Sequence, residues 1–110
     1  MSEITKSTSN YNELPIRFTY NGFNFKQIDR IDNIAIYEQS KPAIDAPIYE
    51  VVKIKKKTYG KLSPLAGQQY SAYPTSSEWG LYGWSYINLA KAQEKFSELV
   101  EKQDRSVLVN

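Results

Sequence analysis

The chain has 110 residues, of which 41% are hydrophobic and 24% charged, and its formal net charge is +2. This length suits a single hydrophobic core, and no stretch approaches the run of about 18 apolar residues that a membrane span requires. The sequence contains neither cysteine nor histidine, which excludes disulfides, thiolate nucleophiles, the usual zinc sites and histidine-based catalysis. These observations favour a non-enzymatic cytoplasmic protein that uses no cofactor or metal and does not enter a membrane.

Residues 1–14 are mostly small and polar, so we expect a flexible N-terminal arm ahead of one domain that spans residues 15–110. The arm lacks an apolar segment, and we therefore expect neither a secretory signal nor a membrane anchor there. The first two strands are predicted at residues 16–20 and 23–28. The Asn21-Gly22 pair between them indicates a hairpin, because both residue types tolerate the positive φ of a type I′ turn.

Two further strands are predicted downstream of this hairpin. Asp32-Asn33 indicates a second turn, and residues 34–39, which are rich in β-forming side chains, follow as the third strand. The two prolines of residues 40–47 indicate an exposed loop before a fourth strand at residues 48–55. Short links between four strands favour an antiparallel meander. Residues 58–77 show no apolar period and predict a long irregular loop, which is uncommon unless it is functional or disordered.

The last element is predicted as an amphipathic helix that begins after Asn88, a suitable N-cap, and ends near Gln103. Its apolar stripe recurs at helical spacing and consists of Leu89, Ala92, Phe96, Leu99 and Val100. Beyond it, the apolar residues 106–109 are expected either to add an edge strand or to fray. The predicted fold is therefore α+β, with a small antiparallel sheet of about four strands packed against one C-terminal helix.

A basic cluster follows the fourth predicted strand and consists of Lys53, Lys55, Lys56, Lys57 and Lys61, with Tyr59 among them. No acidic residue lies between Glu50 and Glu78. The cluster could bind the phosphates of a single nucleic-acid strand while the tyrosine stacks on a base. The other interpretation is that the lysines keep a sheet edge solvated and protect it from aggregation. The small net charge of the whole chain favours this second interpretation.

Aromatic residues are concentrated in residues 70–86, which contain both tryptophans of the chain and four of its nine tyrosines. Two interpretations are open for this aromatic segment. In the first, Trp79 and Trp84 cover one end of the sheet beneath the helix. In the second, the segment is a protein-binding surface made of Tyr73, Trp79, Tyr82, Trp84 and Tyr86, with its tyrosines exposed.

The carboxylates of the strand region show neither the spacing of an EF-hand nor that of a two-metal site. They are Asp29, Asp32, Glu38, Asp45 and Glu50. Charged residues between strands are typical of solvated turns. We therefore predict no catalytic residues and no metal site.

Residues 73–92, which read YPTSSEWGLYGWSYINLAKA, resemble a segment of small uncharacterised bacteriophage and prophage proteins. In that family, Tyr-Pro-x-Ser-x-x-Trp-Gly-x-x-Gly-Trp-Ser/Thr-Tyr precedes a C-terminal helix. Upstream, Asn21-Gly22-Phe23-x-Phe25, Ile36-Tyr37-Glu38-Gln39 and Tyr49-Glu50-Val51 extend the likeness over most of the predicted domain. The resemblance implies an accessory phage protein, and it carries over no catalytic or binding residues.

We therefore expect a non-enzymatic phage-type accessory protein that binds a protein partner through the aromatic segment and modulates or inhibits a host factor in the host cytoplasm. A single-stranded nucleic-acid-binding module that uses the basic cluster is one alternative. A structural or cargo protein of the virion is another. A homo-oligomer is compatible with each of these functions.

Overall fold

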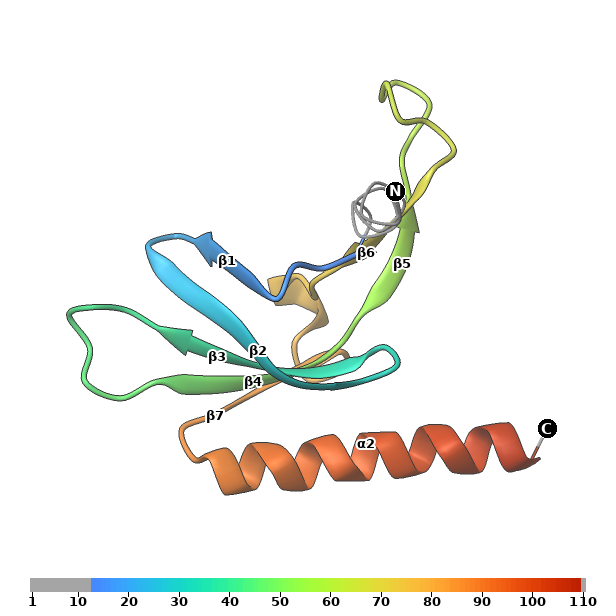
Figure 1. Ribbon diagram of the computed structural model, residues 1–110. Helices are drawn as coiled ribbons and strands as arrows, with labels where there is room; N and C mark the ends of the chain where they lie inside the picture. Colours follow the sequence, from blue (N-terminus) through green and yellow to red (C-terminus); the bar gives the residue numbers. More distant parts are fainter. Residues whose placement is uncertain (1–12, 110) are drawn as a thin grey trace, which may run out of the picture.

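The computed structural model describes the backbone of residues 13–109 and the side chains of residues 13–103. These residues form a five-stranded antiparallel sheet in the order β1-β2-β3-β4-β7, a separate two-stranded hairpin of β5 and β6, and one long helix, α2 (Figure 1). The predicted α+β architecture, an antiparallel sheet with one C-terminal helix, is confirmed. The sheet has one strand more than expected in its main body, and the second small sheet was not predicted.

The strands are β1 (Arg17–Tyr20), β2 (Phe23–Ile31), β3 (Ile34–Ser40), β4 (Ile48–Lys53), β5 (Lys55–Thr58), β6 (Gln69–Ala72) and β7 (Gly83–Tyr86). A short 3₁₀ helix, η1, covers Ser76–Glu78, and α2 covers Leu89–Val109. The predicted strand at residues 48–55 is divided at Ile54, whose amide donates to the Asn33 carbonyl at 2.6 Å instead of joining the ladder of a strand. After this point the chain leaves the main sheet and pairs with β6, within the segment predicted to be irregular.

The predicted Asn21-Gly22 turn is confirmed, because the two residues have φ values of 53° and 80° and join strands in which Tyr20 pairs with Phe23. Two residues further from the turn, Phe18 pairs with Phe25, and their rings stack with centroids 4.6 Å apart. The hairpin register therefore places an aromatic pair on one face of the sheet.

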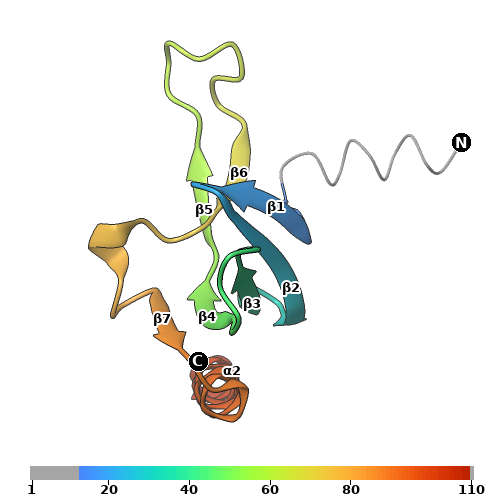
Figure 2. The same cartoon turned by 90° about the vertical axis from the view of Figure 1, so that its left-hand side faces the viewer.

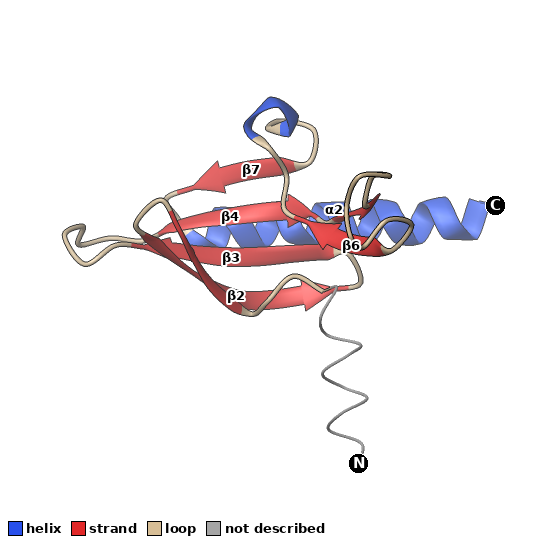
Figure 3. Ribbon diagram, turned by 90° about the horizontal axis from the view of Figure 1, so that it is seen from above, coloured by secondary structure: helices blue, strands red, loops and turns tan. Residues whose placement is uncertain are grey.

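Helix α2 covers one face of the sheet (Figures 1 and 3). Ala92, Phe96 and Leu99 from the predicted stripe are buried against Ile34, Ile36 and Val51 of the sheet. The Asn88 side chain accepts a hydrogen bond from the Lys91 amide at 3.2 Å, as an N-cap does. The helix does not end near Gln103 but continues to Val109, so residues 106–109 extend α2 and form no strand.

The opposite face of the sheet carries a second hydrophobic cluster of Phe25, Ala35, Tyr37, Val52 and Ile54. In Figures 1 and 2, β1 lies on this side of the sheet, away from the helix. Leu14 also packs against this cluster, and Glu13 forms ion pairs with the domain. The last two residues of the predicted N-terminal arm therefore contact the sheet, and residues 1–12 lie outside the described residues.

Candidate functional site

An aromatic groove with a volume of about 1040 Å³ lies on the face of the sheet opposite α2. We define it by the side chains that line it: Phe18, Phe23, Phe25, Tyr73 and Trp79, with Tyr20 at the rim and Glu50 among them. The β1–β2 hairpin contributes the phenylalanines, and the chain between β6 and β7 contributes the other two walls. Two segments that are far apart in the sequence thus form one concave surface.

Tyr73 lies at the centre of the ring contacts in the aromatic groove. Its ring meets those of Phe18, Phe25 and Tyr37 edge to face, with centroids 5.8, 5.9 and 5.4 Å away, and the Trp79 ring stacks at 6.4 Å. Both arrangements are favourable for aromatic pairs, because the positive edge of one ring meets the negative face of another. The walls of the groove are therefore held in place by one another.

Glu50 is the only charged residue among those that line the aromatic groove. It is half-buried in β4, opposite Tyr37 and Ser85 on the neighbouring strands, and its carboxylate accepts a hydrogen bond of 2.5 Å from the Tyr73 hydroxyl. Burial raises the pKa of Glu50, and the Tyr73 hydrogen bond opposes this effect. The prediction of a solvated turn is wrong for this carboxylate, since the two-residue period of the strand turns it into the groove.

The pKa of the Tyr73 hydroxyl is raised, mainly by burial and further by the nearby Glu50 carboxylate. Tyr73 therefore keeps its proton and remains a hydrogen-bond donor to Glu50. The aromatic groove thus offers stacking surfaces and one anchored carboxylate, which is a chemistry suited to binding.

Trp79 is seated by close contacts on two sides. A Cβ atom added to Gly83 would come within 2.8 Å of three atoms of the Trp79 ring, so only glycine leaves room for the indole there. The indole Nε1 donates to the Ser85 hydroxyl at 3.1 Å. These contacts fix the orientation of one wall of the groove.

The turn before Trp79 is tied to β5 through Glu78. One carboxylate oxygen of Glu78 accepts the Thr75 amide at 2.9 Å and the other forms an ion pair with Lys55 at 2.9 Å. The Lys55 hydrogen bond, followed by that of Thr75, lowers the pKa of Glu78 to about 2. Glu78 is therefore ionised over the whole neutral range, so a change of pH within this range does not neutralise the carboxylate that links η1 to β5.

The structure does not bring the five residues of the predicted protein-binding surface together. Tyr73 and Trp79 line the aromatic groove, whereas Trp84 and Tyr86 pack against the core beneath α2 on the other face. Tyr82 lies beside the ammonium groups of Lys53 and Lys55, at 5.5 and 4.5 Å from its ring centroid. The interpretation that both tryptophans lie beneath the helix therefore holds for Trp84 and is wrong for Trp79.

The residues of the basic cluster also separate. Lys53, Lys55 and Lys56 line a cavity of about 420 Å³, which we call the cationic pocket, together with Arg30, Asn33 and Tyr82. Lys57 is half-buried on β5, and Lys61 is exposed beyond the end of that strand. The ring of Tyr59 lies tilted against that of Tyr70, with centroids 4.4 Å apart and an interplanar angle of 33°, across the β5–β6 hairpin. Sequence inspection missed Arg30, because it lies on β2, far from the lysines along the chain.

Among the described residues, no group of three acidic, cysteine or histidine side chains could hold a metal ion. Within the same part of the chain, no helix is long and apolar enough to cross a membrane. No protein-family model, curated protein or solved structure matches the chain.

Proposed function

We propose that the chain is a non-enzymatic accessory protein that binds a protein partner, and that its aromatic groove receives a lysine or arginine side chain of that partner. One observation carries this proposal: the half-buried Glu50 carboxylate lies among aromatic walls, and none of the basic side chains that the structure describes forms an ion pair with it. Within the described residues, the Glu50 carboxylate accepts its hydrogen bond from the Tyr73 hydroxyl, which is neutral.

A cation in the groove would form an ion pair with the Glu50 carboxylate, which the described residues do not provide. A half-buried charge loses part of its hydration, and an opposite charge at contact distance offsets that loss. The faces of tyrosine and tryptophan also attract cations, by about 0.5–2 kcal/mol according to how far the site is desolvated. Arginine fits this combination especially well, because its planar group stacks on rings while its N–H groups reach a carboxylate.

The shape of the aromatic groove suits a side chain that enters from a protein surface. Its volume of about 1040 Å³ slightly exceeds the range of about 300–1,000 Å³ that is common for ligand pockets. Tyr20 at the rim is 66% exposed and can contact residues next to the inserted one. Gln39, Ser76 and Ser85 also line the groove and can hydrogen-bond the backbone of a partner.

The resemblance to phage and prophage proteins suggests where the partner is found. We propose that it is a host or phage protein in the host cytoplasm, whose activity changes when a basic side chain is sequestered. A surface loop with an exposed arginine or lysine has the chemistry that the groove would recognise.

Selection from a library of random peptides on the immobilised protein tests the proposal. We expect the selected peptides to share an arginine or lysine whose replacement by glutamine abolishes binding. Glu50→Gln should weaken binding about tenfold or more, since hydrogen bonds to charged groups contribute about 1.5–3 kcal/mol. Glu38→Gln is the matched control, because Glu38 lies on β3 of the same sheet and lines no part of the groove.

The pH dependence of peptide binding provides a second test. Only ionised Glu50 attracts a cation, so affinity should rise with pH through the raised pKa of this carboxyl. This dependence should be absent in Glu50→Gln. Selected peptides without a basic residue, or equal binding by the Glu50 and Glu38 variants, would show that the groove does not bind a cation.

A further inference from the structure

The cationic pocket gathers four basic side chains from three strands. Arg30 comes from β2, Lys53 from β4, and Lys55 and Lys56 from β5, and the polar side chains of Asn33 and Ser71 also line the cavity. Like charges repel, so such a convergence is unfavourable unless anions balance it. The contacts of these four residues show how far the chain itself provides that balance.

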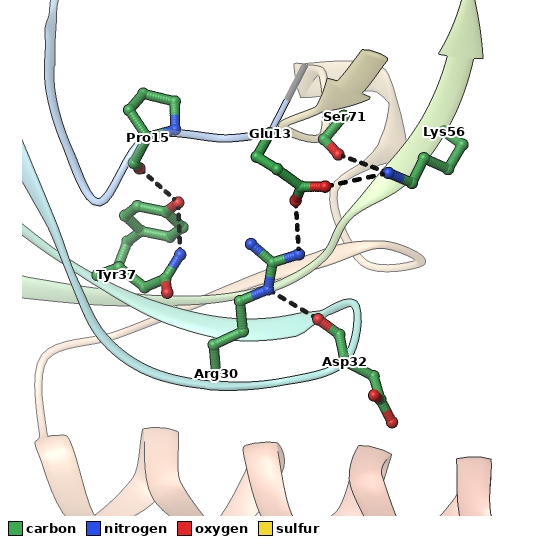
Figure 4. A network of polar contacts seen from close by, with 8 residues as sticks. Glu13, Pro15, Arg30, Asp32, Tyr37, Lys56 and Ser71 are labelled. Carbon is green, nitrogen blue, oxygen red and sulfur yellow. Dashed lines mark hydrogen bonds and ion pairs between the residues drawn. The ribbon is translucent and has the colours of Figure 1, made fainter. Parts of the chain in front are cut away.

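Glu13 already places an anionic group between two of the cations (Figure 4). Its Oε1 atom lies 3.2 Å from Nη2 of Arg30, and its Oε2 atom lies 3.5 Å from Nζ of Lys56. Lys56 also donates to the Ser71 hydroxyl at 3.2 Å. One carboxylate therefore bridges β2 and β5 with both of its oxygens.

The segment that carries Glu13 is attached to the domain at the two following residues. Leu14 packs against the second hydrophobic cluster, and the Tyr37 hydroxyl donates to the Pro15 carbonyl at 2.9 Å. The Nε atom of Arg30 donates to the Asp32 carbonyl at 2.7 Å, which holds the guanidinium in position. Glu13 is therefore presented to a preformed pair of cations.

The four basic side chains of the cationic pocket outnumber the carboxylates that form ion pairs with them. Among the described residues, Glu13 and Glu78 are the carboxylates in ion pairs with the four cations. Lys53 contacts the ring of Tyr82, which attracts a cation but carries no charge to balance it. A ligand with more negative charge than one carboxylate would fit the pocket better than Glu13 does.

We infer that the cationic pocket binds a phosphate group and that Glu13 occupies part of the same site as an internal competitor. A phosphate presents more oxygens than a carboxylate, and the guanidinium of arginine matches its geometry with two parallel hydrogen bonds. The phosphate can belong to a single nucleic-acid strand or to a free oligophosphate. Lys57 and Lys61 continue the positive charge along the β5 side of the hairpin. This extended charge favours a nucleic-acid strand over a free oligophosphate as the source of the phosphate.

An NMR titration with sodium pyrophosphate at constant ionic strength tests the inference. We expect saturable shifts of the Asn33, Ile54 and Ser71 amides, all of which line the pocket. Arg30→Gln should weaken binding about tenfold or more, because it removes charged hydrogen bonds. Lys56→Gln should also weaken pyrophosphate binding. The side chain of Lys56 is exposed, so weaker binding in this second variant cannot be attributed to misfolding.

Two further variants distinguish specific pyrophosphate binding in the cationic pocket from non-specific attraction of this anion to positive charge. Glu13→Gln should tighten pyrophosphate binding about two- to fivefold, since an exposed ion pair of this kind contributes up to about 1 kcal/mol. Lys26→Gln removes the same charge as Lys56→Gln outside the pocket and should leave the affinity unchanged. Equal weakening by the Lys26 and Lys56 variants, or no gain in Glu13→Gln, would overturn the inference.

A short deoxythymidine strand distinguishes the two sources of phosphate. A strand that shifts the same amides and is displaced by pyrophosphate identifies nucleic acid as the ligand. Pyrophosphate binding without strand binding identifies a free oligophosphate. Shifts that do not saturate with either ligand would refute the site, and none of these outcomes depends on Glu50 or the aromatic groove.

Discussion

Gly83 in β7 is buried against the indole of Trp79, and replacement of this glycine by alanine should disturb one wall of the aromatic groove. The new Cβ would lie within 2.8 Å of three ring atoms, whereas ordinary van der Waals contacts begin at 3.4 Å. Either the indole or strand β7 must therefore move. The strain has a purely steric origin, because the Gly83 backbone is not among the glycines with positive φ.

The cost of Gly83→Ala can be estimated from its two parts. Overpacking of a well-filled site costs about 1–3 kcal/mol, and loss of the hydrogen bond from Trp79 to the Ser85 hydroxyl adds about 0.5–1.5 kcal/mol. We therefore expect the free energy of unfolding to fall by about 2–4 kcal/mol. Urea unfolding followed by circular dichroism measures this change, and the thermal midpoint should drop by about 4–8 °C for each kcal/mol.

Two comparisons isolate the proposed cause. Gly60→Ala is the matched control, because no atom lies within 4 Å of its added Cβ and its φ is not positive, so its stability should change little. In a Trp79→Ala background the obstructing ring is absent, and Gly83→Ala should then cost less than about 0.5 kcal/mol. A Gly83→Ala variant as stable as the Gly60 control, or an equal cost in both backgrounds, would refute the steric explanation.

Substitutions at three other positions test the core, the first turn and the buried carboxylate. Phe96→Ala should destabilise the protein by about 3–5 kcal/mol because it empties a large core site, and an unchanged thermal midpoint would mean that α2 does not hold to the sheet through this ring. Gly22→Val should cost about 1–3 kcal/mol, because a β-branched residue is strained at positive φ, whereas Gly22→Asn should cost less. Equal stability of these two variants would contradict the turn. The raised pKa of Glu50 means that the native state holds this proton more tightly than the unfolded state, so stability is lost as pH rises from the ordinary carboxyl range through the native pKa. Glu50→Gln should therefore gain stability relative to the wild type as the pH rises from the ordinary carboxyl range through the native pKa, and a constant difference between the two proteins across the titration would exclude the burial effect.

Local patterns in the sequence were sufficient wherever the controlling interactions are local. Asn21 and Gly22 impose a hairpin because their backbones accept positive φ, and Asn88 starts α2 by capping the Lys91 amide. The helical spacing of Ala92, Phe96 and Leu99 identified the buried face of that helix. Each of these features depends on residues within a few positions of one another.

The short strands β6 and β7 could not be predicted from local preference, because each has only four residues and gains its hydrogen bonds from a partner elsewhere. The chain leaves the main sheet after Ile54, and residues Gln69–Ala72 form a strand because their backbone pairs with β5 there. Gly83–Tyr86 is a strand because the edge of β4 accepts it. Such pairing is decided by the tertiary arrangement, which overrides weak local propensity.

Composition establishes which kinds of side chain are available: a dense group of aromatic residues, a basic cluster, and no cysteine or histidine. Their combination into sites depends on how the strands pair. The chain around Gly80 and Gly83 places Trp79 on one face of the sheet and Trp84 on the other, while the β1–β2 hairpin places Phe18 and Phe25 against Tyr73. A binding site depends on distances in space, and these distances follow from strand pairing between distant parts of the chain. Glu50 and Arg30 are therefore recognised as candidate binding residues only in the folded structure.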